Sequence, residues 1–168
     1  MQTRHKGNIS EAFVIGRLLE IGYTVLVPVG NMERYDLMLE DADGDIVRAQ
    51  VKTGRLRNGA IVFSTASVNY KGERKSYDGQ VDVFLIYSPD TREVYCVPCY
   101  MASKASMYLR VTQSKYKTSP KSTIKWAEDY ILRDRVTVTR HPHKVKNAGS
   151  IPAPATTTES IVTTSTLQ

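Results

Sequence analysis

The sequence predicts an α/β fold in which one mixed β-sheet is flanked by helices. Apolar residues recur at helical spacing over residues 8–22, alternate with polar residues over 35–39 and 46–52, and run almost unbroken over 81–87. The 168 residues, 41% of them hydrophobic, are enough to bury one core. We therefore expect a single domain over residues 1–140. Pro, Ala, Ser and Thr dominate residues 141–168, which we expect to be a disordered tail.

The expected elements alternate between helices and strands along the chain. Residues 8–22 form the first helix and 23–27 the first strand. A hairpin of the strands 35–39 and 46–52 follows, and residues 68–79 form an exposed loop. The remaining expected strands are 61–63, 81–87, 93–98, 108–111 and 133–140, and the remaining expected helices are 100–107 and 122–131.

Each strand of the expected hairpin has one apolar face. If both apolar faces cover the same core, Asp36 lies on the same side of the hairpin as Gln50 and Lys52, because side chains alternate with period two. A two-residue turn would put Asp36 on the opposite side. A three-residue loop, or a bulge with Gly44 at positive φ, pairs Asp36 with Gln50 or Lys52 instead. We expect the odd-length loop.

The first helix carries an acid toward the expected sheet. Glu11 precedes Ile15 by one helical turn and Leu18 by two, so it lies on their side of the helix. Ser10 and Arg17 share a polar side. A carboxylate directed at a core is costly unless it is paired or binds a metal. An ion pair between Glu11 and a basic residue at the helix edge is the alternative to a metal site.

Asp36, Gln50 and Lys52 form a set that suits a hard cation. A carboxylate, an amide oxygen and the backbone carbonyl of Val51 are oxygen ligands of the kind that Mg²⁺ takes together with water. Lys52 beside them would orient a nucleophilic water or neutralise charge on a phosphate. Taken alone, the same residues also fit a surface hairpin with a mixed polar face.

The chain is basic, with a formal net charge of +6. This charge favours a polyanionic partner, with nucleic acid before an acidic membrane surface. No apolar run is long enough to cross a membrane, and the basic start has no apolar segment after it, so we expect a cytoplasmic protein rather than a secreted one. Cys96 and Cys99 close a late hairpin rather than opening a helix, which favours buried thiols over a redox or zinc site.

Basic and aromatic side chains gather in three segments, in a pattern that suits contacts with phosphates. The first segment lies at the start of the first helix, near its positive end. The others are the loop over 53–59 and the loop over 68–79, for which plain solvated loops are the alternative. The candidate DNA-contacting residues are Arg4, Lys6, Arg55, Arg57, Tyr70, Lys71, Arg74, Lys75 and Tyr77.

The order and spacing of the candidate site residues resemble the PD-(D/E)XK nuclease superfamily, in the arrangement of archaeal Holliday-junction resolvases and small intron-encoded homing endonucleases. The resemblance spans residues 6–98 and rests on Glu11 in the helix, Asp36 on a strand, and Gln50 and Lys52 on the next strand. It implies a restriction-endonuclease-like fold in which Glu11, Asp36 and Gln50 take the metal-site positions. Lys52 takes the position of the catalytic lysine. The implied cofactor is Mg²⁺, for which Mn²⁺ can substitute, with no small-molecule cofactor.

Two residues depart from the pattern of the superfamily. Tyr35 stands where the motif's name has proline, which is a common change. Gln50 stands where most members have Glu or Asp, which removes one negative charge from the metal site. An amide oxygen still ligates Mg²⁺, so we expect a weaker affinity for the cation rather than its loss.

The resemblance implies a metal-dependent DNA endonuclease, most simply a homing enzyme that cuts both strands of a specific duplex site. With one site in each chain, cutting both strands requires a homodimer or homotetramer. The alternatives are a Holliday-junction resolvase acting on branched DNA and a restriction or repair nuclease. A DNA-binding module without catalysis is a further alternative, because Gln50 lacks the usual charge.

Overall fold

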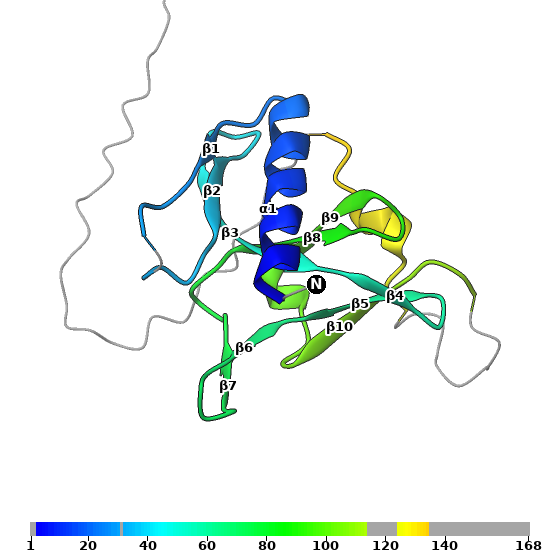
Figure 1. Cartoon of the computed structure of the whole chain (residues 1–168). Coiled ribbons are helices and arrows are strands. Elements are labelled where there is room, and N and C mark those ends of the chain that lie inside the picture. The colour runs from blue at the N-terminus through cyan, green and yellow to red at the C-terminus, as the bar shows by residue number, and fades with distance from the viewer. Residues whose placement is uncertain (1–2, 31, 114–123, 135–168) are drawn as a thin grey trace, which may run out of the picture.

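A mixed five-stranded sheet occupies the centre of the computed structural model, which describes residues 3–30, 32–113 and 124–134. The α/β class and the mixed sheet expected from the sequence are confirmed. Figure 1 labels the elements in chain order. They are α1 (Thr3–Glu20), β1 (Val25–Leu26), β2 (Leu37–Glu40), β3 (Ile46–Thr53), β4 (Arg55–Arg57), β5 (Ala60–Ser64), β6 (Ala66–Val68), β7 (Arg74–Ser76), β8 (Val83–Ser88), β9 (Glu93–Pro98), the 3₁₀ helix η1 (Cys99–Met101), β10 (Ser106–Arg110) and the 3₁₀ helix η3 (Ala127–Tyr130).

The central sheet has the strand order β1-β2-β3-β8-β9. Strands β3 and β8 pair in parallel, and the other neighbouring strands pair antiparallel. The parallel pair needs a long connection. That connection contains β4 and β5, which join β10 in a second sheet, and the separate hairpin of β6 and β7. Figure 1 shows the second sheet and the β6–β7 hairpin below the central sheet.

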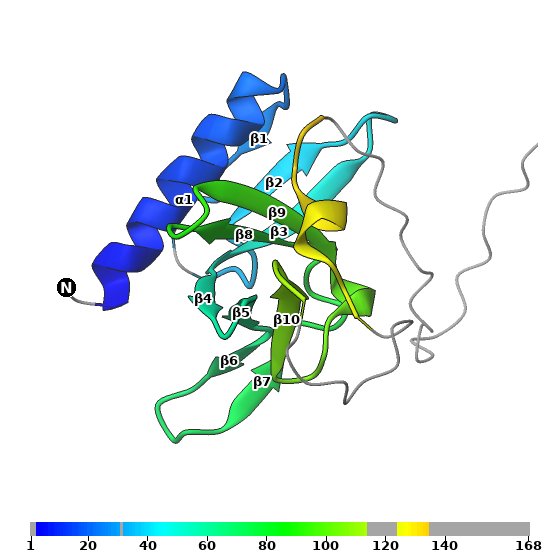
Figure 2. The ribbon, with the colours of Figure 1, turned by 90° about the vertical axis from the view of Figure 1, so that its right-hand side faces the viewer.

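Helix α1 packs on one face of the central sheet (Figure 2). Val14 and Leu18 on α1 are fully buried in the same cluster as Leu37 of β2. Phe84 and Ile86 of β8 belong to a second cluster, together with residues of β5 and β10. Strand β8 therefore contributes to both cores, and every one of its residues is buried. This explains the almost unbroken apolar run in its sequence.

Strands β2 and β3 pair in the register that their alternation predicts. Leu37 lies opposite Ala49, and a loop of five residues, 41–45, joins the two strands. Gly44 adopts a φ of 86° in this loop. The Asp41 side chain accepts two hydrogen bonds from backbone N–H groups of the same loop, which hold its shape. The predicted loop of odd length is confirmed.

Helix α1 begins earlier than predicted, at Thr3, and ends at Glu20. The prediction that Ser10 lies on a polar side of the helix is wrong. Ser10 is 1% exposed, and its Oγ lies 2.6 Å from Oγ1 of Thr53. The buried hydroxyl is tolerated because it has a hydrogen-bond partner. This contact fixes α1 against the end of β3.

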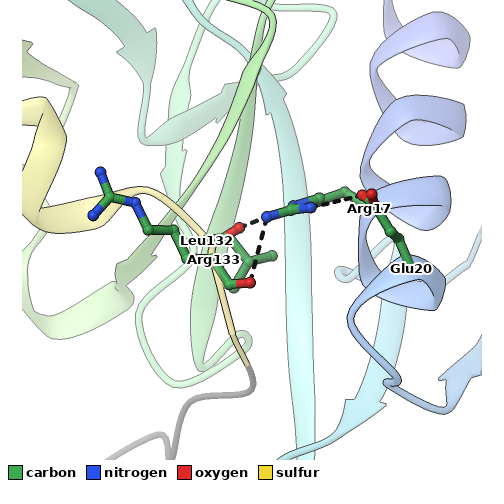
Figure 3. A network of polar contacts seen from close by, with 4 residues as sticks. All are labelled: Arg17, Glu20, Leu132 and Arg133. Atoms are coloured by element: carbon green, nitrogen blue, oxygen red, sulfur yellow. Dashed lines mark hydrogen bonds and ion pairs between the residues drawn. The ribbon is translucent and has the colours of Figure 1, made fainter.

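Further along α1, Arg17 ties the helix to the chain after η3. Its Nε donates a hydrogen bond to the carbonyl oxygen of Leu132 at 3.1 Å, and Nη2 donates to that of Arg133 at 3.3 Å (Figure 3). Nη1 forms an ion pair with Glu20 at 2.6 Å. Leu132 is itself buried in the core cluster beneath α1. Arg17 thus joins segments that lie far apart in the sequence.

The loop over 53–59 and the helix over 100–107 are wrong predictions. The basic segment contains β4, which pairs antiparallel with β5. Where a helix was expected, a single turn, η1, is followed by β10, which pairs with the whole of β5. Met107 and Leu109 are buried while Tyr108 is exposed, so the period in β10 is two rather than helical.

Other predictions fail where short strands or bridges replace the expected element. The loop over 68–79 carries β7, which pairs with β6 to form a hairpin. In place of a helix over 122–131, the described residues hold only the short η3. It lies between two isolated β-bridges, one from Trp126 to Arg110 and one from Ile131 to Tyr95. The backbone hydrogen bonds of these bridges go to neighbouring strands, not to the next helical turn.

The last predicted strand, 133–140, and the tail, 141–168, lie mainly outside the described residues. Arg133 and Asp134 are described and are not in a strand. Among the described residues, none of the helices combines the length and the apolar character needed to cross a membrane.

Gly54, between β3 and β4, has no room for a side chain. A Cβ there would lie 2.5 Å from Cγ2 of Ile61 and 2.8 Å from Cγ2 of Ile86. We expect Gly54→Ala to lower the free energy of unfolding by about 1–3 kcal/mol, because the stiff β-branched neighbours cannot move aside. Urea denaturation measures this change.

Gly16→Ala is the matched control for this substitution. Gly16 lies inside α1, and nothing lies within 4 Å of its Cβ position. We expect Gly16→Ala to raise the free energy of unfolding by about 0.5–1 kcal/mol, because alanine is the better helix former. A Gly54→Ala variant as stable as the wild type would contradict the tight packing at the end of β3.

Candidate active site

Asp36 immediately precedes β2 and faces β3. Its N–H donates a hydrogen bond to the carbonyl oxygen of Ala49 at 2.9 Å. Its Oδ2 accepts a hydrogen bond from the N–H of Val51 at 2.7 Å and another from Nε2 of Gln50. Donors on β3 therefore hold the carboxylate in place. The register of the hairpin brings Asp36 and Gln50 together, as the alternation of the two strands predicts.

Gln50 and Lys52 lie on the same face of β3. The Gln50 side chain is buried, and Lys52 is half-buried. Nζ of Lys52 donates a hydrogen bond to Oη of Tyr77 at 2.9 Å. In the parallel ladder Gln50 lies opposite Phe84 and Lys52 opposite Ile86. The parallel strand pair of the sheet, in which every residue of β8 is buried, thus supports both residues.

Glu11 belongs to α1, which packs on the face of the sheet that carries Ala49 and Val51, and it interacts electrostatically with Asp36. Glu11 is exposed, yet its carboxyl group is partly desolvated. Burial, and then the negative charge of Asp36, raise the pKa of Glu11. Burial also raises the pKa of Asp36, against the hydrogen bond from Val51 and the charge of Lys52, which lower it. The helix acid and the strand acid therefore interact electrostatically across the site.

The chemistry of these groups fits a hard divalent cation. A carboxylate whose charge raises the pKa of a second carboxylate, as Asp36 does for Glu11, forms part of a site where a cation would be stabilised. The hydrogen bonds that Asp36 accepts from other described residues fall on Oδ2, which leaves Oδ1 for a ligand. Among the described residues, no group of three or more His, Cys, Asp or Glu is placed to hold a metal ion. The set therefore relies on Gln50 as well as the two acids.

The orientation of Gln50 bears directly on a role as a ligand. Nε2 points to Asp36, so Oε1, the atom that would ligate a metal, is turned away from that carboxylate. Rotation of the amide exchanges the two atoms. The N–H of Val51 also points to Asp36. The backbone carbonyl of Val51 is the remaining predicted metal ligand.

Three exposed basic segments lie in the same part of the fold. The start of α1, strand β4 and the β6–β7 hairpin all lie in the lower half of the views in Figures 1 and 2. Tyr77 differs from the other candidate DNA contacts because it is only 5% exposed and contacts Lys52. The exposed candidates are Arg4, Lys6, Arg55, Arg57, Tyr70, Lys71, Arg74 and Lys75.

Sequence reasoning missed Arg34 and the role of Tyr77 beside Lys52. The guanidinium carbon of Arg34 lies 4.5 Å from the centroid of the Tyr77 ring. Arg34 also donates hydrogen bonds to side-chain and backbone groups of the β6–β7 hairpin. No spacing pattern links these residues, because the contacts form only when separate segments fold together.

The two cysteines are not reactive groups of this site. Burial raises the pKa of the Cys96 thiol to about 12. Burial, with the charges of Asp78 and Asp82, raises the pKa of the Cys99 thiol to about 11. Both thiols are free and protonated at neutral pH, as expected for semi-buried cysteines in a hairpin.

The chain belongs to the PD-(D/E)XK endonuclease family, whose model matches residues 1–133. The match covers the helix, the central sheet and all four candidate site residues. It establishes a nuclease and confirms the superfamily that the order of Glu11, Asp36, Gln50 and Lys52 indicates. The family and the fold together make this protein a DNA endonuclease.

A solved structure of a bacterial homing endonuclease, I-Ssp6803I, is similar to this chain, with a TM-score of 0.61 and 25% sequence identity. The similarity covers 78% of this chain and 89% of that chain. No curated protein sequence matches the chain. The restriction-endonuclease-like fold expected from the sequence is confirmed by the family match and this structure.

Removal of the Glu11 charge should stabilise the protein when divalent cations are absent. Burial and the charge of Asp36 raise the pKa of Glu11 in the folded state. The free energy of unfolding therefore falls as the pH rises from the pKa of Glu11 in the unfolded chain to its higher pKa in the folded protein. We expect Glu11→Gln to have a higher free energy of unfolding than the wild type at neutral pH in EDTA. Below that pH window the difference should disappear. Urea denaturation at several pH values measures both effects.

Glu33→Gln, at an exposed position before β2, is the control for loss of a glutamate charge. Its free energy of unfolding at neutral pH should stay within about 0.5 kcal/mol of the wild-type value, as for most surface substitutions. If Glu11→Gln were no more stable than the wild type at neutral pH, Glu11 and Asp36 would not form a repulsive pair.

Proposed function

We propose that this DNA endonuclease depends on a divalent metal ion and is of the homing type, cutting both strands of duplex DNA at one long, specific site. The observation that carries the proposal is that Asp36 is hydrogen-bonded to Gln50, which lies two residues before Lys52 on β3, and acts electrostatically on Glu11 of α1. The similarity to a bacterial homing endonuclease supports the homing type.

Glu11, Asp36, Gln50 and the carbonyl of Val51 would hold one Mg²⁺ ion, or Mn²⁺ in its place. When bound, the cation would polarise a phosphoryl oxygen and lower the pKa of a bound water. Lys52 orients the attacking water or neutralises charge on the phosphate. The hydrogen bond from the N–H of Val51 already holds the Asp36 carboxylate, whereas the Gln50 amide, which now donates to Asp36, rotates to present Oε1 to the cation.

The exposed basic residues of the start of α1, of β4 and of the β6–β7 hairpin contact the DNA backbone in this proposal. The net charge of +6 favours such contacts, because Lys and Arg displace counterions from phosphates. Backbone contacts set the position of the duplex, and base contacts read its sequence. Tyr70 at the exposed tip of the hairpin is suited to a contact within a groove.

Cutting both strands requires two sites on opposite strands of the duplex. Each chain supplies one candidate site in its described residues, so we propose a homodimer or homotetramer whose twofold axis coincides with that of the target. We propose that it acts in the cytoplasm. The proposed reaction uses the metal ion and no small-molecule cofactor.

Cleavage should require both a divalent cation and Asp36. We expect the protein to cut a random-sequence duplex library at one long site with Mg²⁺ or Mn²⁺ and not to cut with EDTA. Asp36→Asn should lower the cleavage rate by about 10²- to 10³-fold. Removal of another group that stabilises the transition state electrostatically lowers enzyme rates by a similar factor. Sequencing of the cleaved ends identifies the site.

Asp43→Asn, in the exposed loop between β2 and β3, is the matched control and should cleave at the wild-type rate. Cleavage of four-way junctions without cleavage of duplex DNA would select a resolvase instead. A short recurrent site would select a restriction or repair enzyme. DNA binding without cleavage in either cation would select an inactive binding module.

Gln50→Glu should tighten cation binding and destabilise the metal-free protein. The substitution replaces the donor that faces Asp36 with another negative charge. We expect the Mg²⁺ concentration for half-maximal cleavage to fall by about tenfold. We also expect a lower urea midpoint in EDTA. An unchanged Mg²⁺ dependence would mean that Gln50 is not a ligand.

A further inference from the structure

We propose that Tyr77 is a positioning residue for Lys52 and that Arg34 holds Tyr77 in place. The inference rests on the proposed function, in which Lys52 acts on the scissile phosphate or on the attacking water. Three sets of contacts carry it. They join Lys52 to Tyr77, Tyr77 to the core, and Arg34 to both Tyr77 and the β6–β7 hairpin.

The first contact restricts the lysine ammonium. A lysine side chain has a flexible four-carbon stem and three donors that rotate freely, so its ammonium has no fixed direction of its own. Nζ of Lys52 donates to Oη of Tyr77 at 2.9 Å and lies 4.6 Å from the ring centroid. The hydroxyl occupies one donor and leaves the others for a phosphate oxygen or a water.

Core packing fixes the tyrosine in turn. Its ring is 5% exposed and meets Phe84 edge-on, with 5.6 Å between centroids and an interplanar angle of 87°. The Tyr77 carbonyl oxygen accepts hydrogen bonds from the N–H groups of Gln80 and Val81, in the turn that leads to β8. Phe84 lies opposite Gln50 in the parallel ladder. The position of the tyrosine ring is thus set by the same strand pair that carries the candidate site.

Arg34 adds a second restraint on the ring. Its guanidinium carbon lies 4.5 Å from the Tyr77 centroid. Nε donates to Oε1 of Gln80 at 2.7 Å, close to the same turn. Nη1 donates to Oγ of Ser67 at 2.9 Å and Nη2 to the carbonyl oxygen of Ser76 at 3.1 Å, in β6 and β7 respectively. A planar guanidinium with its donors engaged in this way holds a fixed position over the Tyr77 ring and acts as a rigid clamp on it. An ammonium group cannot reproduce this arrangement.

Tyr77→Phe tests the hydroxyl alone, because it keeps the ring and its contacts with Phe84 and Arg34. We expect the single-turnover cleavage rate to fall about 10- to 100-fold, as for a misplaced catalytic group. The Kd for DNA and the urea midpoint should stay near the wild-type values. A rate equal to that of the wild type would overturn the proposal.

Tyr95→Phe is the matched control for the loss of a buried hydroxyl. Tyr95 is 2% exposed, and its Oη lies 2.9 Å from Oγ1 of Thr91. The substitution removes a hydrogen-bonded hydroxyl from an equally buried ring that does not contact Lys52. The cleavage rate of Tyr95→Phe should match that of the wild type.

A double-mutant cycle with Lys52→Ala separates positioning from structure. If Tyr77 acts through Lys52, Tyr77→Phe causes no further loss of rate in the Lys52→Ala background. A structural effect would slow both backgrounds by the same factor and would overturn the proposal. Arg34→Lys keeps the charge but loses the clamp, so it should lower the rate in the wild-type background and not in the Lys52→Ala background.

The same cycle distinguishes failure of this inference from failure of the proposed function. If Lys52→Ala is slow and Tyr77→Phe is as fast as the wild type, the function stands and the positioning role falls. If Lys52→Ala cleaves at the wild-type rate, the proposed role of the lysine falls, and the positioning role falls with it.

Discussion

The pairing of β2 with β3 is the constraint on which the candidate site depends. Leu37, Leu39 and Val47 are all buried in the cluster beneath α1. Burial of each such side chain is worth about 1.5–3 kcal/mol. A slip of the pairing by one residue would turn one strand's apolar side chains to the other face, along with Asp36. The hydrophobic core thus places the acid beside Gln50, and the hydrogen bond from Val51 then fixes its direction.

The candidate site stores electrostatic repulsion that the surrounding fold withstands. Burial raises the pKa of both Glu11 and Asp36, and the charge of Asp36 adds to the effect on Glu11. Helix α1 nevertheless stays in place because Val14 and Leu18 are buried in the core and two polar contacts attach the helix further. Ser10 contacts Thr53 near Glu11, and further along the helix Arg17 binds the carbonyl oxygen of Leu132. Such local repulsion is a common property of functional sites, where stability is exchanged for activity.

Periodicity in the sequence was sufficient to predict the central hairpin, β8 and β9. The strand predicted over 93–98 coincides with β9, and the alternation of β2 and β3 predicted which side chains share a face with Asp36. The helices predicted over 100–107 and 122–131 failed because their residues bond to neighbouring strands instead. Local spacing does not record such tertiary pairing.

The same limit applies to the contacts around the lysine. Tyr77 follows a basic segment and was predicted to contact DNA, but its ring is buried beside Lys52. Ser10 is polar yet buried, because Thr53 satisfies its hydroxyl. Each of these contacts joins residues that are distant in the sequence, so only the folded chain reveals them.

The β6–β7 hairpin contributes no side chain of residues 67–76 to either core cluster. Substitutions and changes of length at its tip, around Gly72, therefore leave the central sheet intact. In the proposed function this hairpin contacts DNA, so a change at its tip would alter that contact without altering Asp36, Gln50 or Lys52. Within the hairpin, Ser67 and Ser76 accept hydrogen bonds from Arg34, so we expect tolerated changes to concentrate between these two serines.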